Sequence, residues 1–175
     1  ASRLSDYLGV TQIIWLDEGV YLDETDGHID NLACFARPGE VLLTWTDDTD
    51  DPQYRISAAA YDALSRATDA RGRRLRIHRI HQPDPMTVSA HEYAGLVNMP
   101  GTHHRPLGHR LAGSYINFYL ANGGMVLPVF ENPRDAAAVA VMGEIFPDRE
   151  IIAVPAREIL LGGVCIHCIT QQQPA

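Results

Sequence analysis

Residues 31–46 have the sequence NLACFARPGEVLLTWT. Two runs rich in apolar residues, 31–37 and 41–46, are separated by Pro38-Gly39. Apolar runs of this length favour strands, and a Pro-Gly pair between two of them is typical of a tight turn. This segment therefore predicts an antiparallel β-hairpin.

A helix and a returning strand are predicted to follow this hairpin. The helix covers 52–68, with either Asp50 or Asp51 as its capping residue. Its apolar face consists of Tyr54, Ala58, Tyr61 and Leu64. Residues 74–80 then return to the pattern of a strand.

The same order of elements is predicted a second time. The second unit consists of strands at 114–121 and 125–130, a helix at 132–145 and a strand at 150–154. A shift of 85 residues superposes the units and places Gly39 on Gly124 and Val41 on Val126. The sequence therefore predicts a mixed α/β (α+β) fold of repeated hairpin–helix–strand modules, with an incidental alternation of elements as the alternative.

The remaining segments complete a single predicted domain over residues 1–175. Residues 12–16 have the pattern of a short buried strand. Residues 81–109 are rich in Pro, Gly and His and show no clear period. A loop of this length within one domain is usually functional or mobile.

Composition narrows the classes of partner. The chain has 22 acidic and 14 basic residues among 175, a formal net charge of −8. A nucleic-acid partner is not expected, because such partners require a basic surface. A membrane partner is not expected either, because no apolar run approaches the roughly 18 residues that cross a bilayer. Three cysteines and no secretory signal favour a reducing, cytoplasmic location over a disulfide framework.

One acidic segment contains a candidate proton-transfer pair. Residues 23–31, DETDGHIDN, surround His28 with four carboxylates. A strand that begins near Gly27 would place His28 and Asp30 on one face. A histidine beside a carboxylate has the chemistry needed for proton transfer, and the other carboxylates suit a cation. A polar turn that leads into a strand is the alternative.

A second segment contains a candidate nucleophile. Residues 162–168 have the sequence GGVCIHC. A thiolate beside a histidine suits nucleophilic catalysis, whereas either Cys165 or Cys168 can instead be a small buried hydrophobe. The Cys-x-x-Cys spacing also fits a redox pair or half of a zinc site. A second ligand pair at metal spacing is missing, since the adjacent His103 and His104 would diverge on an extended chain.

A third segment alternates polar and aromatic residues. Residues 110–119, RLAGSYINFY, predict a strand. Its polar side chains form either one wall of a pocket or the solvated face of a sheet.

Together these segments resemble the agmatine deiminases, a guanidino-modifying family related to peptidyl-arginine deiminases. The matching motifs, in family order, are TDGHIDN at 25–31, RLAGSYINFY at 110–119, FPDR at 146–149, AREILLGG at 156–163 and IHCITQQ at 166–172. The resemblance covers essentially the whole chain but only the C-terminal half of the family's proteins. It implies part of a pentein propeller, in which five similar modules surround a central pocket.

The resemblance also implies roles for individual residues. Cys168 would attack the guanidinium carbon of agmatine, and His28 would protonate the departing ammonia and then activate water. Asp30 would accept hydrogen bonds from the guanidinium. Substrate binding is further implied for Asp26, Ser114 and Asn117. No metal or organic cofactor is implied, and the product would be N-carbamoylputrescine, in putrescine biosynthesis.

The chain departs from the family pattern, and alternative functions stay open. Val164-Cys165 replaces the usual Gly-Asn, and a partial propeller would have an open pocket, so we expect weak or no activity from this chain alone. Arginine or peptidyl arginine is the alternative substrate, with Arg110 as a cation for a carboxylate. A non-catalytic remnant and a zinc-binding domain are the other classes, and assembly as a homo-oligomer stays open.

Overall fold

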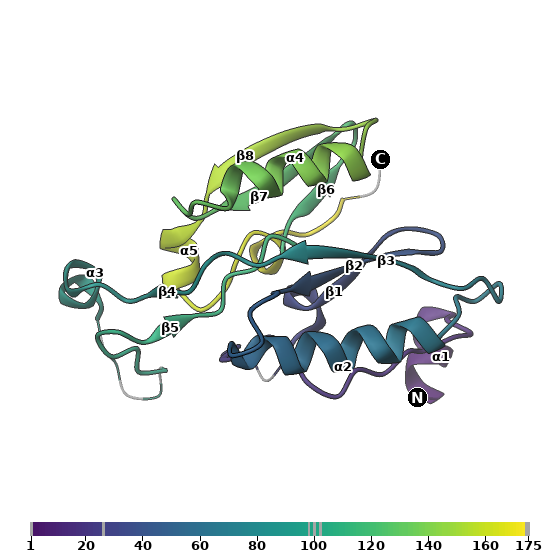
Figure 1. Ribbon diagram of the computed structural model, residues 1–175, viewed down its shortest axis with the longest axis horizontal. Helices are drawn as coiled ribbons and strands as arrows, with labels where there is room; N and C mark the ends of the chain where they lie inside the picture. The colour runs from purple at the N-terminus through teal and green to yellow at the C-terminus, as the bar shows by residue number, and fades with distance from the viewer. Residues whose placement is uncertain (1, 26, 98, 100, 102, 174–175) are drawn as a thin grey trace.

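The computed structural model describes residues 2–25, 27–97, 99, 101 and 103–173. Two three-stranded sheets, each accompanied by one long helix, form most of the molecule (Figure 1). The elements in chain order are α1 (Ser2–Leu8), η1 (Ile29–Asn31), β1 (Ala33–Arg37), β2 (Glu40–Trp45), α2 (Pro52–Arg66), β3 (Arg76–His81), β4 (Met86–Thr87), α3 (Ala90–Gly95), β5 (Arg110–Leu111), β6 (Tyr119–Ala121), β7 (Gly124–Val129), α4 (Asp135–Ile145), β8 (Glu150–Pro155), α5 (Arg157–Leu161) and η2 (His167–Ile169). The η elements are single turns of 3₁₀ helix.

The first module has the predicted hairpin, helix and returning strand. Strands β1 and β2 are antiparallel, and Gly39 in their turn has a φ of 84°, a value that glycine adopts without steric cost. Asp51 caps α2 by accepting a hydrogen bond from the backbone N–H of Gln53 at 2.9 Å. Strand β3 then pairs with β2 in parallel.

The second module repeats this topology, which confirms the predicted repeat of elements. Strands β6 and β7 are antiparallel, and β8 pairs with β7 in parallel after α4. The predicted shift of 85 residues is wrong by one, because β2 begins at Glu40 and β7 at Gly124. The left-handed turn glycines, Gly39 and Gly123, obey the same shift of 84. The prediction aligned Gly39 with Gly124 because both are glycines. The residue equivalent to Gly39 is Gly123, because these two share the left-handed backbone conformation.

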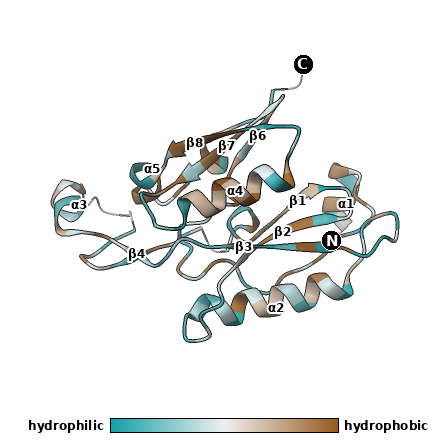
Figure 2. Ribbon diagram, turned by 45° about the horizontal axis from the view of Figure 1, so that its top comes forward, coloured by the Kyte–Doolittle hydropathy of each residue, from teal (hydrophilic) through white to brown (hydrophobic). Residues whose placement is uncertain are grey.

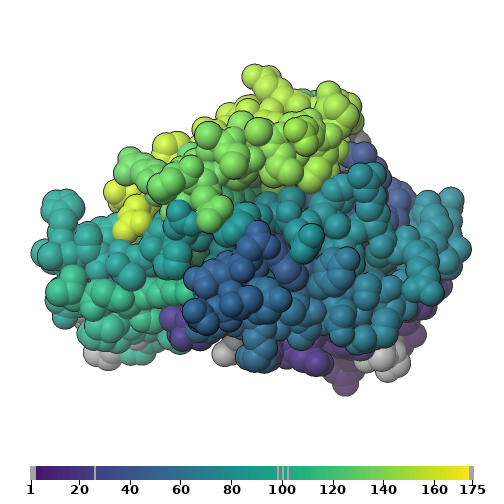
Figure 3. Space-filling view, in the orientation of Figure 1, coloured from purple at the N-terminus to yellow at the C-terminus, as the bar shows by residue number. Residues whose placement is uncertain are grey.

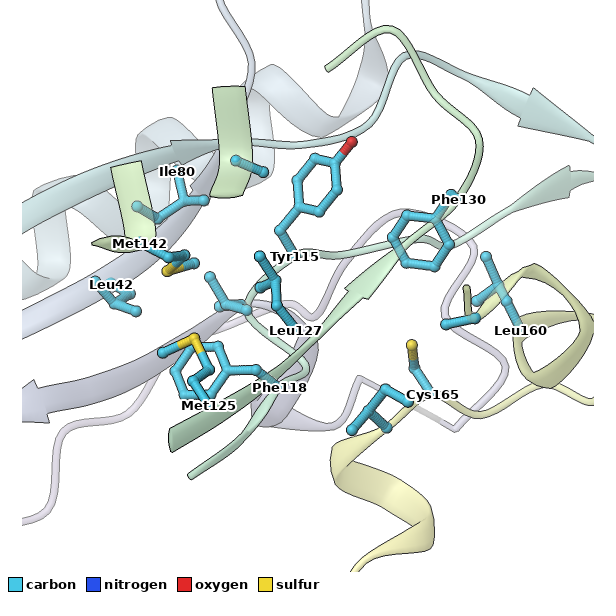
Figure 4. Packing of buried hydrophobic residues seen from close by; sticks show 14 of the residues in the cluster. Leu42, Ile80, Tyr115, Phe118, Met125, Leu127, Phe130, Met142, Leu160 and Cys165 are labelled. Carbon is cyan, nitrogen blue, oxygen red and sulfur yellow. The ribbon is translucent and has the colours of Figure 1, made fainter. Parts of the chain in front are cut away.

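Two buried clusters form the core, and the larger one joins the modules. The smaller cluster lies between the first sheet and α2 and includes Leu43, Ile56 and Leu64. The larger cluster contains Leu42 and Ile80 from the first sheet together with residues of the second module such as Met142 (Figure 4). Helix α4 therefore packs against β3 as well as β8. Figure 3 shows the two modules meeting along a continuous boundary on the face in view.

Hydropathy follows this arrangement. Hydrophobic residues concentrate on α4 and on most of the strands, whereas β3 and α3 are largely hydrophilic (Figure 2). Within the part of the chain that the structure describes, no helix combines the length and apolar character required to cross a membrane. The described residues also form no closed ring of modules, so the pentein propeller stays a prediction.

Two predicted strands are wrong in whole or in part. Residues 12–16 form no strand; Ile14 and Leu16 instead pack their side chains against the smaller cluster. Of the strand predicted at 114–121, only β6 forms. Residues 113–118 are all buried, so the solvated sheet face, one of the two alternatives for this segment, is wrong.

Several elements were not predicted. The region 81–109 contains β4 and α3 rather than an unbroken loop, and β5 pairs with β4. Helix α3 begins with a capping box in which Ser89 and Glu92 satisfy each other's backbone N–H groups. The short helices α1 and α5 were missed as well. Residues 29–31 form η1 rather than the start of the first strand.

Candidate active site

The three cysteines occupy different environments. Burial raises the pKa of the Cys34 thiol and of the Cys165 thiol to about 12. Cys165 packs in the larger buried cluster, where Figure 4 shows its sulfur among apolar side chains. Cys168 is exposed on η2. Because alkylation and nucleophilic attack require an accessible thiolate, Cys168 is the candidate nucleophile.

Asp30 lies beside Cys168 although the two are 138 residues apart in sequence. The Asp30 Oδ2 atom is 3.4 Å from Cys168 Sγ and 2.8 Å from His167 Nδ1. The side chain of Asp30 is 17% exposed. Its other oxygen, Oδ1, is buried and has no hydrogen-bond partner among the described residues. The oxygen beside the thiol is therefore Oδ2, whereas Oδ1 is closed to a ligand in this conformation.

Asn117 contacts both Cys168 and the η1 turn that contains Asp30. It is fully buried, and its Nδ2 atom is 3.5 Å from Cys168 Sγ. The same amide nitrogen donates to Asn31 Oδ1 at 2.9 Å. The Asn117 Oδ1 atom accepts a hydrogen bond from the His167 backbone N–H at 2.9 Å. Asn117 thus links η1, which contains Asp30, to η2, which contains Cys168.

Ser114 lies in a second buried layer. Its Oγ is 3.0 Å from Thr44 Oγ1, and Thr44 donates to the backbone carbonyl of Asn31 at 2.7 Å. Ser114 is fully buried, so in this conformation its hydroxyl supports η1 and is not open to a ligand.

His28 and Asp30 lie at the start of η1 rather than in a strand. Ile29–Asn31 is a 3₁₀ turn that His28 precedes, so the strand predicted to begin near Gly27 does not form. The shared role of the two side chains stays a prediction. His28 is exposed, and its side chain makes no hydrogen bond or ion pair with a described residue. Asp26 lies outside the described residues.

The Gly162-Gly163 turn makes a close contact with the acidic segment. Gly163 has a φ of 84°, and a Cβ atom at this position would collide with the ion-paired side chains of Arg105 and Glu24. This contact joins three segments that surround the site. Val164 does not have the left-handed backbone conformation that would strain a residue with a branched side chain.

A groove of about 300 Å³ opens beside Asp30 and His167. Its other lining residues are almost all apolar and include Ile14, Leu16 and Ile29. Nowhere in the described residues do three or more histidine, cysteine or carboxylate side chains gather in a metal-binding arrangement.

Comparison with known proteins identifies the family of this chain. The model of the Porphyromonas-type peptidyl-arginine deiminases matches residues 1–174. The chain belongs to this family. This confirms the resemblance drawn from the sequence motifs.

Individual relatives carry more specific names. The chain is 51% identical over 172 residues to the agmatine deiminase of Pseudomonas putida and 53% identical over 172 residues to that of Pseudomonas aeruginosa. Each match covers 98% of this chain and 47% of the relative. A solved structure of the Enterococcus faecalis agmatine deiminase superposes with a TM-score of 0.93 at 37% identity, covering 99% of this chain and 47% of that one. The chain thus spans about half the length of the curated relatives it matches.

Within this member of the family, several contacts at the site were not predicted from sequence. Asn31 and Thr44 belong to the two strands of the predicted hairpin, and no local pattern indicated that they support Asn117 and Ser114. The Glu24–Arg105 ion pair likewise joins residues 81 apart. The sequence shows His167 only as a neighbour of the cysteines. Its contact with Asp30 joins residues that are distant in sequence, so it forms only in the folded chain.

Proposed function

We propose that this chain carries the nucleophile of an agmatine deiminase, which hydrolyses agmatine to N-carbamoylputrescine and ammonia in cytoplasmic putrescine biosynthesis. The observation that carries the proposal is the meeting of Cys168 with Asp30 across 138 residues of sequence. The names of the Pseudomonas and Enterococcus relatives support agmatine as the substrate.

The proposed reaction begins with substrate capture. Asp30 accepts two guanidinium N–H groups, which fixes the planar group and keeps it cationic. The Oδ2 atom of Asp30, which lies 3.4 Å from Cys168 Sγ, supplies one of the acceptors. The second acceptor is Oδ1, which substrate binding has to uncover because it is buried in the free chain. Capture also neutralises the carboxylate charge next to Cys168, which favours the thiolate. We further propose that Asp26 and the buried residues Ser114 and Asn117 complete substrate binding, the latter two by holding η1 and η2 in place.

Two bond exchanges follow. The Cys168 thiolate attacks the guanidinium carbon, a C–S bond forms, and the C–N bond to one terminal nitrogen breaks. His28 supplies the proton with which that nitrogen leaves as ammonia. His28 then removes a proton from water, whose oxygen adds to the same carbon as the C–S bond breaks. The product then loses its remaining O–H proton to solvent, which leaves the neutral ureido compound and the regenerated thiolate.

The position of Arg110 favours agmatine over arginine. An arginine-specific site needs a cation for the substrate α-carboxylate, and Arg110 is the candidate from sequence. In the folded chain, however, the Arg110 guanidinium makes a bidentate ion pair with Asp51, at 3.0 and 2.8 Å. Its charge is already neutralised by a carboxylate that is 5% exposed. Agmatine lacks the α-carboxylate and needs no such cation.

The chain alone is proposed to be weakly active or inactive. Asp30 and His167 border an open groove, and the side chain of His167 is 46% exposed. A site this open does not exclude water or enclose a substrate on all sides. In the longer proteins of the family, further modules of a pentein propeller would cover it.

Turnover of agmatine tests the proposal. The ureido product would be followed with the purified chain alone and with the chain co-expressed with the part of the Pseudomonas putida agmatine deiminase that it does not match. We expect turnover below about 1 per second for the chain alone, a clear gain on co-expression, and complete loss with Cys168→Ala. Excess arginine should not compete.

Two results would count against the proposal. Turnover that survives Cys168→Ala would exclude this nucleophile. No turnover in either preparation, although both fold, would favour a non-catalytic remnant.

A further inference from the structure

We propose that His167 is a positioning residue, whose Nδ1–H group holds the Asp30 carboxylate in the orientation required by substrate and nucleophile. The inference rests on the proposed function, because that function assigns guanidinium binding to Asp30 and attack to Cys168. It adds a second histidine to the site besides His28.

A single carboxylate oxygen faces both neighbours. The Asp30 Oδ2 atom is 2.8 Å from His167 Nδ1 but 3.4 Å from Cys168 Sγ. A carboxylate only accepts hydrogen bonds, so Nδ1 must carry the hydrogen, and the shorter contact belongs to the stronger donor. His167 therefore competes with the thiol for Oδ2. The thiol is then held less firmly in its protonated form, which is unreactive.

The same contact fixes the second oxygen. With Oδ2 held by His167, the plane of the Asp30 carboxylate is set, and Oδ1 stays without a partner among the described residues. A guanidinium needs an acceptor plane that is already oriented in order to bind through two parallel hydrogen bonds. His167 restricts the carboxylate to that orientation before substrate arrives, and substrate binding then has to uncover Oδ1.

The backbone of His167 is itself held firmly. Its N–H group lies within hydrogen-bond distance of both Asn117 Oδ1, at 2.9 Å, and the Asn117 carbonyl oxygen, at 3.1 Å. Its carbonyl oxygen accepts from the Thr170 hydroxyl at 2.9 Å and from the Thr170 N–H at 3.1 Å. Hydrogen bonds on both sides therefore fix the backbone that carries the imidazole. A histidine on a mobile surface segment would lack this support.

Two substitutions of similar shape distinguish the effect of the hydrogen bond from the effect of side-chain size. In His167→Asn an amide N–H occupies approximately the place of Nδ1, whereas His167→Leu has a similar branched shape and no donor. The readout is the rate at which iodoacetamide alkylates the chain at pH 7, followed by mass spectrometry. Cys165 is buried and Cys34 is partly buried, and burial raises the pKa of both thiols to about 12. The alkylated peptide is therefore mapped, and only modification of Cys168 is counted.

We expect His167→Leu to slow alkylation about tenfold, the effect of losing one hydrogen bond to a charged group. His167→Asn should stay within about threefold of the original chain, since it keeps the donor. Simple loss of bulk would expose the thiol and speed the reaction, which is the opposite direction. An unfolded variant is recognised because all three cysteines would then react.

The inference fails if His167→Leu is alkylated as fast as the original chain, or if His167→Asn is slowed as much as His167→Leu. Alkylation requires no turnover, so the test stands even if agmatine is not the substrate. In the co-expressed enzyme, His167→Leu should also raise KM for agmatine, and His167→Asn should restore it. A common loss of kcat without a change in KM in both variants would contradict the role assigned to Nδ1.

Discussion

The Asp51–Arg110 ion pair links the first module to the segment that leads into the site, and its removal should destabilise the whole chain. Asp51 caps α2 and accepts hydrogen bonds from Arg110 and from Gln82 at 3.0 Å. Asp51→Ala removes a helix cap, at a cost of about 1 kcal/mol, and leaves a largely buried guanidinium unpaired, at a cost of about 3 kcal/mol. We expect a total loss of about 4 kcal/mol in the free energy of unfolding.

This loss is measurable by thermal unfolding followed by circular dichroism at pH 7. For a chain of this size, about 4 kcal/mol lowers Tm by roughly 8–16 °C. Asp62→Ala is the matched control, because it breaks an i,i+4 ion pair on the same helix whose side chains are 67% and 72% exposed. That control should cost no more than about 0.5 kcal/mol. A Tm for Asp51→Ala within 3 °C of the original, about 1 kcal/mol, would refute the reasoning.

The same pair gives stability a pH dependence. Burial opposes the ionisation of Asp51, but hydrogen bonds from Arg110 and the Gln53 N–H, together with the Arg110 charge, outweigh it and lower the pKa. A lowered folded-state pKa contributes stability above the unfolded value of about 3.9, and this is lost as pH falls through the folded value. Asp51→Asn should therefore be less stable than the original at pH 7, with the difference shrinking below about pH 4.

Three further predictions test the packing around the site. Met142→Ala, at a fully buried position between the modules, should cost about 2–5 kcal/mol in urea unfolding; a cost under about 1 kcal/mol would contradict the packing described. Gly163→Ala should lower the free energy of unfolding by at least about 1–2 kcal/mol, because alanine is strained in the left-handed backbone conformation of this residue. Gly143→Ala is the control: its Cβ would lie in open space within α4, so its effect should be neutral or stabilising. Glu92, whose pKa is lowered to about 2 chiefly by its hydrogen bond from Arg157, should stabilise α3 above about pH 4.5 and progressively less towards pH 2; amide exchange in α3 of Glu92→Gln should lack this pH dependence.

The modules could be predicted because their signals are local. Apolar runs, the turn at Pro38-Gly39 and the capping aspartate of α2 each act within a few residues, so sequence patterns suffice to identify them. The capping box of Ser89 and Glu92 is equally local, but it lies in a region whose proline and glycine content predicts a loop. The strand predicted at 12–16 failed for a different reason, since an apolar run packs equally well without a strand partner.

The site could not be predicted from local patterns. Asp30 and Cys168 meet only after two complete modules have folded, and no periodicity spans the 138 residues between them. Family resemblance supplied their pairing. The strand expected to begin near Gly27 does not form, because residues 29–31 make the 3₁₀ turn of η1.

The corrected repeat explains why the site forms where it does. Under the shift of 84, which the strand bounds and the turn glycines fix, Asp30 in the first module corresponds to Ser114 in the second. Both residues precede the hairpins of their modules. One supplies the carboxylate beside Cys168, and the other holds the turn that carries this carboxylate through Thr44. Equivalent positions of the repeated module thus carry the proposed substrate-binding carboxylate and a residue that supports it. A substitution at Ser114 should therefore disturb the site by moving Asp30 rather than by losing a contact with substrate.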